Sequence, residues 1–164
     1  MSDKHGLDAL SRSDFLKITG LSSLAALFGG VSRAHAAGEK PERLYVVTHA
    51  DDDADRAALA LILASLDAKK IGRENSGVTV WFTLQGARLC RRGAGDKITS
   101  PVFKKFGTMS DILAQATKAG AKIAACPFCL DALDLKKSDY IQGLERKGGD
   151  YVAAQVGKAD VIWM

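Results

Sequence analysis

Two cysteines stand three residues apart in the segment CPFC, residues 126–129, directly after the short apolar run KIAA. The run predicts a buried strand, and the residues that follow it predict the first turn of a helix. The first backbone N–H groups of a helix have no partner within it and favour a nearby thiolate. We therefore expect Cys126 to be a nucleophile near neutral pH, with a buried structural cysteine as the alternative.

Cys129 lies one helical turn after Cys126, so the two sulfur atoms can approach each other. It can form a disulfide, release sulfur from a persulfide, or simply pack inside the protein. Cys90 lies in a basic stretch beyond a second apolar run, and we interpret it as an unpaired cysteine without a chemical role. His49 follows the first apolar run, where a loop histidine with ordinary hydrogen bonds is favoured over a metal ligand.

Two clusters of charged residues could bind ions or substrates, but each has a simpler structural explanation. Asp51, Asp52 and Asp53 precede a predicted helix, and aspartate is preferred at the start of helices. The spacing of a calcium loop, with its glycine turn and distal glutamate, does not follow. A set of lysines in the later glycine-rich stretch is expected to be a solvated loop face, with attraction of an anionic sulfur species as the alternative. These are Lys97, Lys104 and Lys105.

The elements that position these residues alternate between strands and helices. Apolar, β-branched runs predict strands at Arg43–Thr48, Val78–Leu84, Lys122–Ala125 and Asp160–Met164. Helices are predicted at Asp55–Lys70, Thr108–Lys118, Phe128–Leu133 and Tyr151–Val156, with one turn around Ala87–Arg91 and no assignment for Asp139–Lys147. Strands that alternate with helices and are buried on both faces predict a mainly parallel sheet. The fold class is a three-layer, flavodoxin-like α/β domain.

In such sheets, ligands bind beyond the carboxyl ends of the strands. The residues after the first three predicted strands therefore converge on one edge. They are His49 and Asp51–Asp53, then Gln85, Gly86 and Cys90, then Cys126 and Cys129.

At these residues the chain resembles the DsrE/DsrF-like family, the sulfur-relay group that includes the TusD-like proteins. The resemblance rests on RLYVVTHADDDADRAALALILA, VTVWFTLQGARL, ILAQATKAGAKIAACPFCLDALDL and the closing ADVIWM. It implies that Cys126 accepts sulfane sulfur from a donor and passes it, as a persulfide, to the thiol of an acceptor protein. Some members carry a second cysteine three residues on, as Cys129 is here. We expect this sulfur chemistry to require no cofactor. The resemblance also implies a homo-oligomer, either a trimer or a hexamer.

Two other classes of protein remain as alternatives. The segment CPFC resembles the C-P-x-C of a glutaredoxin-type thiol-disulfide redox protein, but that fold needs a later cis-proline. The chain has only Pro41, Pro101 and Pro127, and none lies downstream, so redox chemistry would require a different fold. A zinc module is the second alternative, with Cys90, Cys126, Cys129 and His49 as ligands. Their spacing is not that of a compact zinc knuckle.

Composition limits the broader class. The chain has 164 residues, of which 47% are hydrophobic and 26% charged, as in an ordinary soluble domain. Its net charge of +4 is spread among interspersed acids and bases, so we expect no nucleic-acid partner. Three cysteines are too few for a disulfide-rich scaffold.

The first 36 residues form the pattern of a secretory signal peptide. A polar stretch is followed by the uncharged run Ile18–Val31 and then by the A-x-A cleavage pattern Ala34-His35-Ala36. The run is too short to span a bilayer, so no membrane attachment is expected after cleavage. The stretch Ser11–Lys17 resembles a twin-arginine signal with Ser13 in place of the second arginine, which leaves the Tat and Sec routes open. We expect a periplasmic domain comprising residues 37–164.

The export hypothesis predicts a mature protein that begins near Ala37. N-terminal sequencing of protein from its native host, after separation of periplasm and cytoplasm, measures this directly. An intact start at Met1 or Ser2 in the cytoplasmic fraction would contradict the hypothesis.

Overall fold

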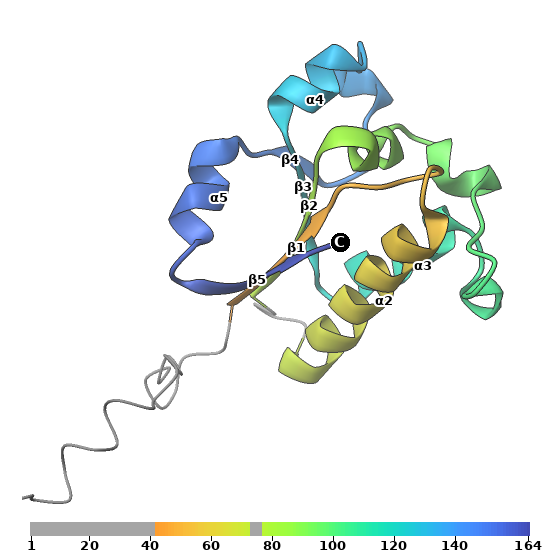
Figure 1. The fold of residues 1–164 in the computed structure, drawn as a ribbon, viewed down its shortest axis with the longest axis horizontal. Helices are drawn as coiled ribbons and strands as arrows, with labels where there is room; N and C mark the ends of the chain where they lie inside the picture. Colours follow the sequence, from red (N-terminus) through yellow and green to blue (C-terminus); the bar gives the residue numbers. More distant parts are fainter. Residues whose placement is uncertain (1–41, 73–76) are drawn as a thin grey trace, which may run out of the picture. The chain divides into compact units, whose positions relative to one another are not determined.

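A computed structural model describes residues 42–72 and 77–164 of the chain (Figure 1). The predicted signal peptide, residues 1–36, lies outside the described residues. None of the helices in the described segments has the length and apolar character needed to cross a membrane.

Five parallel strands form one sheet in the order β4-β3-β2-β1-β5. They are β1 (Glu42–Val47), β2 (Val78–Phe82), β3 (Lys122–Ala125), β4 (Leu144–Arg146) and β5 (Ala159–Trp163). The chain builds β1 to β4 in one direction and then returns across the sheet to add β5 beside β1. The predicted α/β fold with a parallel sheet is therefore confirmed.

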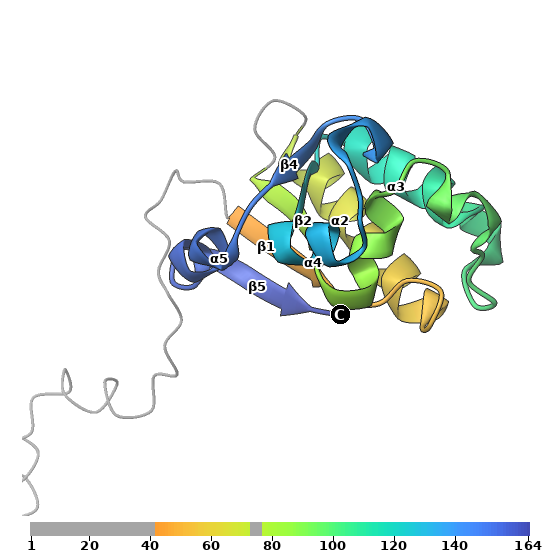
Figure 2. The same ribbon diagram turned by 90° about the horizontal axis from the view of Figure 1, so that it is seen from above.

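Helices cover the two faces of the sheet unequally (Figures 1 and 2). The bounds are α2 (Ala54–Ile71), α3 (Met109–Lys118), α4 (Pro127–Ala132) and α5 (Gly149–Gln155). Helices α2 and α3 pack side by side on one face, while the short α5 lies on the other. The sequence marks the starts of the two longer helices: Asp53 accepts a hydrogen bond from the N–H of Arg56, and Thr108 forms a capping box with Asp111.

The segments whose secondary structure could not be assigned firmly from the hydrophobic pattern form short helices and a short strand. Residues of the predicted turn around Ala87–Arg91 form a 3₁₀ helix, η1 (Leu84–Cys90). The unassigned stretch Asp139–Lys147 contains the end of another 3₁₀ turn and the three-residue strand β4. Strand β2 ends at Phe82, two residues before the predicted end, because Thr83 begins the turn into η1.

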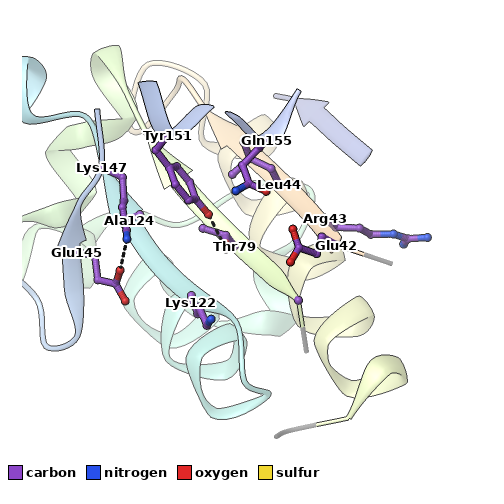
Figure 3. Close-up of a pocket in the computed structure, with 11 residues that line it drawn as sticks. Glu42, Arg43, Leu44, Thr79, Lys122, Ala124, Glu145, Lys147, Tyr151 and Gln155 are labelled. Carbon is purple, nitrogen blue, oxygen red and sulfur yellow. Dashed lines mark hydrogen bonds and ion pairs between the residues drawn. The ribbon is translucent and has the colours of Figure 1, made fainter. Parts of the chain in front are cut away.

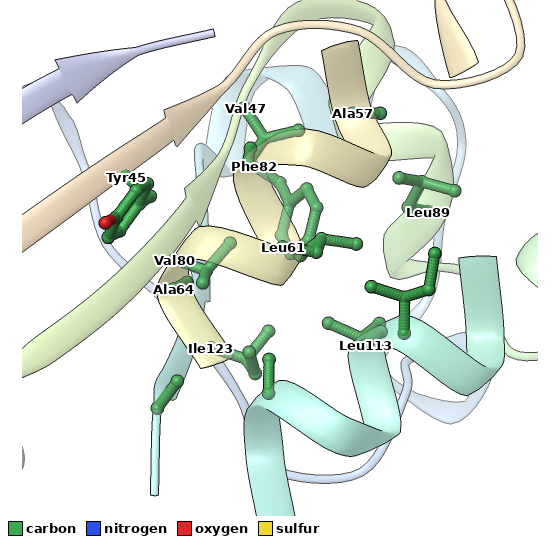
Figure 4. Close-up of a cluster of buried hydrophobic side chains, with 14 of the residues drawn as sticks. Tyr45, Val47, Ala57, Leu61, Ala64, Val80, Phe82, Leu89, Leu113 and Ile123 are labelled. Carbon is green, nitrogen blue, oxygen red and sulfur yellow. The ribbon is translucent and has the colours of Figure 1, made fainter. Parts of the chain in front are cut away.

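The main core lies between the sheet and helices α2 and α3 (Figure 4). It contains Tyr45 and Val47 from β1, Val80 and Phe82 from β2, and Leu61 from α2, all of them almost completely buried. A smaller cluster lies on the α5 face and consists of Leu44, Val46, Trp81, Ala124, Cys126 and Val152. Alternate residues of β1, β2 and β3 thus enter different cores, as the period of a strand requires.

At Gly86 the loop after β2 touches the end of β1. The N–H of Gly86 donates to the carbonyl oxygen of Thr48 at 3.0 Å, and the N–H of Thr83 donates to that of Val47 at 3.0 Å. A Cβ atom on residue 86 would lie 2.2 Å from the carbonyl oxygen of Val47. Only glycine fits here, and its fit fixes the course of the chain just after Thr83 and Leu84.

We expect Gly86→Ala to destabilise the protein, because the new Cβ cannot fit against the Val47 carbonyl without moving the backbone. The cost of such overpacking is about 1–3 kcal/mol of unfolding free energy. Gly149→Ala is the matched control, since nothing lies within 4 Å of the Cβ built there. Chemical denaturation of both variants measures the effect, and equal stabilities would contradict the close packing at Gly86.

Candidate functional site

The register of β2 and β3 brings the candidate site together at the carboxyl edge of the sheet. Phe82, the last residue of β2, is paired with Ala125, the last residue of β3. The N–H of Cys126 then donates to the carbonyl oxygen of Phe82 at 2.9 Å. The residues that leave the two strands, Thr83 and Cys126, therefore emerge side by side.

Cys129 is the cysteine that this arrangement surrounds with hydrogen bonds. Its Sγ atom lies 3.3 Å from the Thr83 hydroxyl and accepts a hydrogen bond from the N–H of Leu84 at 3.2 Å. Burial acts to raise the pKa of the Cys129 thiol, but the hydrogen bonds from Thr83 and Leu84, together with the neighbouring Cys126 thiol, hold that pKa below its ordinary value. Cys129 is therefore the activated thiol of the pair.

The Leu84 amide is presented to the sulfur by an uncommon backbone conformation. Leu84 has φ of +50°, in the left-handed region that residues with a Cβ seldom adopt. Its side chain is 64% exposed, so side-chain burial does not explain the conformation. Such strained residues cost roughly 1–3 kcal/mol and cluster at functional sites.

Cys126 is placed differently. It occupies the N-cap position of α4, but its side chain makes no capping hydrogen bond. Pro127 is the first residue of the helix and has no N–H to offer. The Cys126 side chain is 9% exposed and packs in the α5-face cluster with Trp81 and Val152. The hydrogen bonds expected at Cys126 are therefore found at Cys129.

The remaining cysteine and the predicted loop histidine lie outside this arrangement. Cys90 is completely buried, and burial, followed by the nearby Cys129, raises the pKa of its thiol well above the usual range. His49 pairs with Asp52 through Nδ1 at 2.6 Å and approaches Arg56 through Nε2 at 3.2 Å. The Ala50 amide and then the His49 ring hold the pKa of Asp52 below its usual value. His49 is thus a loop histidine with ordinary partners.

The other charged groups have structural partners or face solvent. Asp53 caps α2, and Asp51 forms an ion pair with Arg88 at 2.8 Å. The lysines at 97, 104 and 105 are exposed, as expected for a solvated loop face. Among the residues that the structure describes, no group of three or more His, Cys, Asp or Glu side chains is arranged to hold a metal ion.

Helix α4 is held at the sheet edge by Arg146, the last residue of β4. The guanidinium donates to the Tyr140 hydroxyl at 2.8 Å and to the Asp131 carboxylate at 2.9 Å. Between the two cysteines, Phe128 points outward and is 80% exposed. The cysteine pair thus lies on a small, anchored helix beside an exposed aromatic ring.

A pocket of about 210 Å³ on the α5 face does not include the cysteines (Figure 3). It lies nearer the amino ends of the strands, between α5 and the exposed part of the sheet. Lys147 pairs there with Glu145 at 3.0 Å, and the Tyr151 hydroxyl lies 3.3 Å from that of Thr79. The pocket therefore contains an internal ion pair and lies apart from the cysteine pair at the opposite edge.

Two residues of the site, Thr83 and Leu84, were missed by the sequence analysis. The available signal was a hydroxyl residue at the end of a strand predicted to lie beside the cysteine-bearing strand. The sequence could not show that the chain turns at Leu84, because the pattern VTVWFTL runs on without a break. The backbone amide of Leu84 leaves no trace in a sequence at all.

Comparisons with known proteins identify the fold. No protein-family model matches the chain. The ychN protein from E. coli, solved as a crystal structure, is similar with a TM-score of 0.55 and 15% identity over 75% of this chain and 99% of that one. The chain therefore has a DsrE-like fold, as ychN does. Protein MTH1491 from Methanobacterium thermoautotrophicum, of unknown function, is similar with a TM-score of 0.47 and 14% identity over 77% of this chain and all of that one.

A curated relative is the uncharacterized protein MJ0760 of Methanocaldococcus jannaschii. It is 24% identical over 139 residues, which cover 77% of this chain. The chain spans about half the length of this relative, 48%.

The geometry predicts the order in which the three cysteines react with iodoacetamide. Cys129 should react first at pH 7, because its lowered pKa gives it more thiolate than an ordinary cysteine, whose pKa is about 8.5. Cys90 should react only after unfolding, since it is buried and its pKa is raised. Short labelling pulses followed by peptide mass spectrometry measure the order. Labelling of Cys90 as fast as Cys129 in the folded protein would contradict the described site.

Proposed function

We propose that the protein carries sulfane sulfur as a persulfide on the Cys126–Cys129 pair and passes it to an acceptor thiol. The observation that carries the proposal is the hydrogen bonding of one thiol of the pair at the carboxyl edge of a DsrE-like fold. A thiolate is the nucleophile that sulfur transfer requires, and a lowered pKa supplies it near neutral pH.

Transfer of sulfane sulfur between thiolates needs no cofactor. The thiolate attacks the terminal sulfur of a persulfide or polysulfide donor, a new S–S bond forms, and the donor's S–S bond breaks with its electron pair leaving on the donor thiolate. An acceptor thiolate then attacks the terminal sulfur of the protein persulfide in the same way. The electron pair returns to the cysteine, which is ready for another cycle.

The resemblance noted in the sequence assigns the persulfide to Cys126, at the position that matches the family motif, and the spacing of the pair gives Cys129 a role in its release. The proposed function requires only that one of the two cysteines bears the sulfur and the other takes part in its release. Two thiols that stand three residues apart at the start of a helix allow one to bear the sulfur and the other to expel it as hydrosulfide by closing a disulfide.

The same pair of cysteines supports a second candidate, a thiol-disulfide redox protein. Both are free thiols, they stand three residues apart at the start of α4, and Cys126 influences the pKa of Cys129. The two functions differ in what the protein retains after reaction. A redox protein exchanges electrons and keeps no extra sulfur, whereas a carrier gains mass in steps of one sulfur atom.

The proposal includes the partners, the compartment and the oligomeric state expected from the sequence. A donor of sulfane sulfur and an acceptor thiol protein are the partners, the compartment is the periplasm, and the chain forms a trimer or hexamer. The first 36 residues support the compartment, and the family resemblance supports the oligomer and the partners.

We expect the double variant Cys126→Ser/Cys129→Ser to lose sulfur uptake, because it removes both candidate nucleophiles. The reduced wild-type protein is exposed to polysulfide, and intact mass is measured. Cys90→Ala is the matched control and should load sulfur as the wild type does, since Cys90 is buried. Undiminished loading of the double variant would overturn the proposal, and a disulfide without added sulfur in the wild type would favour the redox candidate.

A further inference from the structure

We infer that Cys129, and not Cys126, bears the sulfane sulfur, and that Thr83 is its positioning residue. The assignment rests on the proposed function and deepens it by giving each thiol its role. The observation that supports it lies in the segment that follows β2, where the Thr83 hydroxyl and the Leu84 amide form a hydrogen-bonding site for a sulfur anion.

The two groups approach one sulfur atom from consecutive residues. The Thr83 hydroxyl lies 3.3 Å and the Leu84 nitrogen 3.2 Å from Cys129 Sγ. Once the thiol has lost its proton, the sulfur can only accept, so both the hydroxyl and the amide donate to it. Thr83 is 8% exposed, and a hydrogen bond to a charged atom is stronger where water is largely excluded.

The same two hydrogen-bond donors also act when the terminal sulfur is passed to the acceptor. As an acceptor thiolate attacks the terminal sulfur of a Cys129 persulfide, negative charge returns to Cys129 Sγ. The Thr83 hydroxyl and Leu84 amide already point at that atom, so the leaving thiolate is stabilised where it forms. A leaving thiol with a lower pKa departs faster, so one arrangement serves both uptake and delivery.

Cys126 suits the other role. Its side chain is more buried than that of Cys129 and belongs to the α5-face cluster that includes Trp81. It makes no capping hydrogen bond with the first amides of α4. From the N-cap position of α4, three residues before Cys129, the Cys126 thiol can attack the inner sulfur of the persulfide. An S–S bond forms between the two cysteines, the bond to the terminal sulfur breaks, and that sulfur leaves as hydrosulfide with the thiol proton going to solvent or to the leaving group.

The backbone at Leu84 supports the same assignment. Its φ of +50° turns the amide toward Cys129 while the apolar side chain remains exposed. The turn is fixed from both sides, because Thr83 and Gly86 donate to the carbonyls of Val47 and Thr48. The strained conformation is thus held by the sheet edge rather than by the Leu84 side chain.

The first test measures the reactivity of Cys129 against pH. We expect Thr83→Val to lower its alkylation rate at pH 7 by about tenfold and to move its pH profile upward, because a hydrogen bond to a charged group is lost. Thr83→Ser should restore both. Thr79→Val is the matched control, since Thr79 lies on β2, four residues before Thr83, is equally buried and contacts Tyr151 rather than the cysteines. An unchanged profile in Thr83→Val would overturn the positioning role.

The second test locates the sulfur. Each single variant is loaded with polysulfide, the persulfide is trapped with iodoacetamide, and peptides are analysed by mass spectrometry. We expect Cys126→Ser to hold a persulfide on Cys129 and Cys129→Ser to load little. The reverse pattern would overturn the assignment while leaving the proposed function intact. Absence of loading in every protein, wild type included, would overturn both, and the pH profile would still report whether Thr83 tunes Cys129.

Discussion

The site depends on one constraint, the in-register ending of two adjacent parallel strands. Phe82 and Ala125 are partners in the ladder, and the Cys126 amide continues the pairing by one residue. Because both strands run the same way and stop together, the two segments that follow them must share the space above the edge. The segment after β3 supplies the thiols, and the segment after β2 supplies the hydrogen-bond donors. A shift of one residue in this register would turn the side chains to opposite faces and separate donors from sulfur.

At Cys129 two opposing effects meet. Partial burial disfavours the thiolate, whereas the hydroxyl, the amide and the neighbouring thiol favour it, and the hydrogen bonds prevail. Cys90 shows the outcome without such donors: burial dominates and its pKa rises. The donors at Cys129 require the strained backbone at Leu84, at roughly 1–3 kcal/mol. Burial of a side chain such as Phe82 in the adjoining core contributes about 1.5–3 kcal/mol, enough to offset that strain.

The carboxyl edge of the sheet and its α5 face therefore differ in how firmly their side chains are positioned. At the carboxyl edge, Gly86 and Arg146 tie the loops and α4 to the strands, so the cysteine pair is supported from both sides. On the α5 face, a seven-residue helix leaves part of the sheet beside a pocket that contains the Lys147–Glu145 ion pair. Firm positioning is thus concentrated where the thiols lie, which is consistent with a site that must aim donors at a single atom.

The sequence by itself determined the parallel α/β fold, the end of β3 just before Cys126 and the aspartates that begin α2. These follow from local properties: apolar runs, helical periodicity and capping residues act over a few neighbours. It also identified the cysteine pair as the chemical feature. Only the tertiary structure decided which cysteine receives the hydrogen bonds, because Thr83 and Leu84 are more than 40 residues from Cys129 and one donor is a backbone amide. The short strand β4 was likewise hidden, since three residues carry no period of their own and pair only because β3 is already in place.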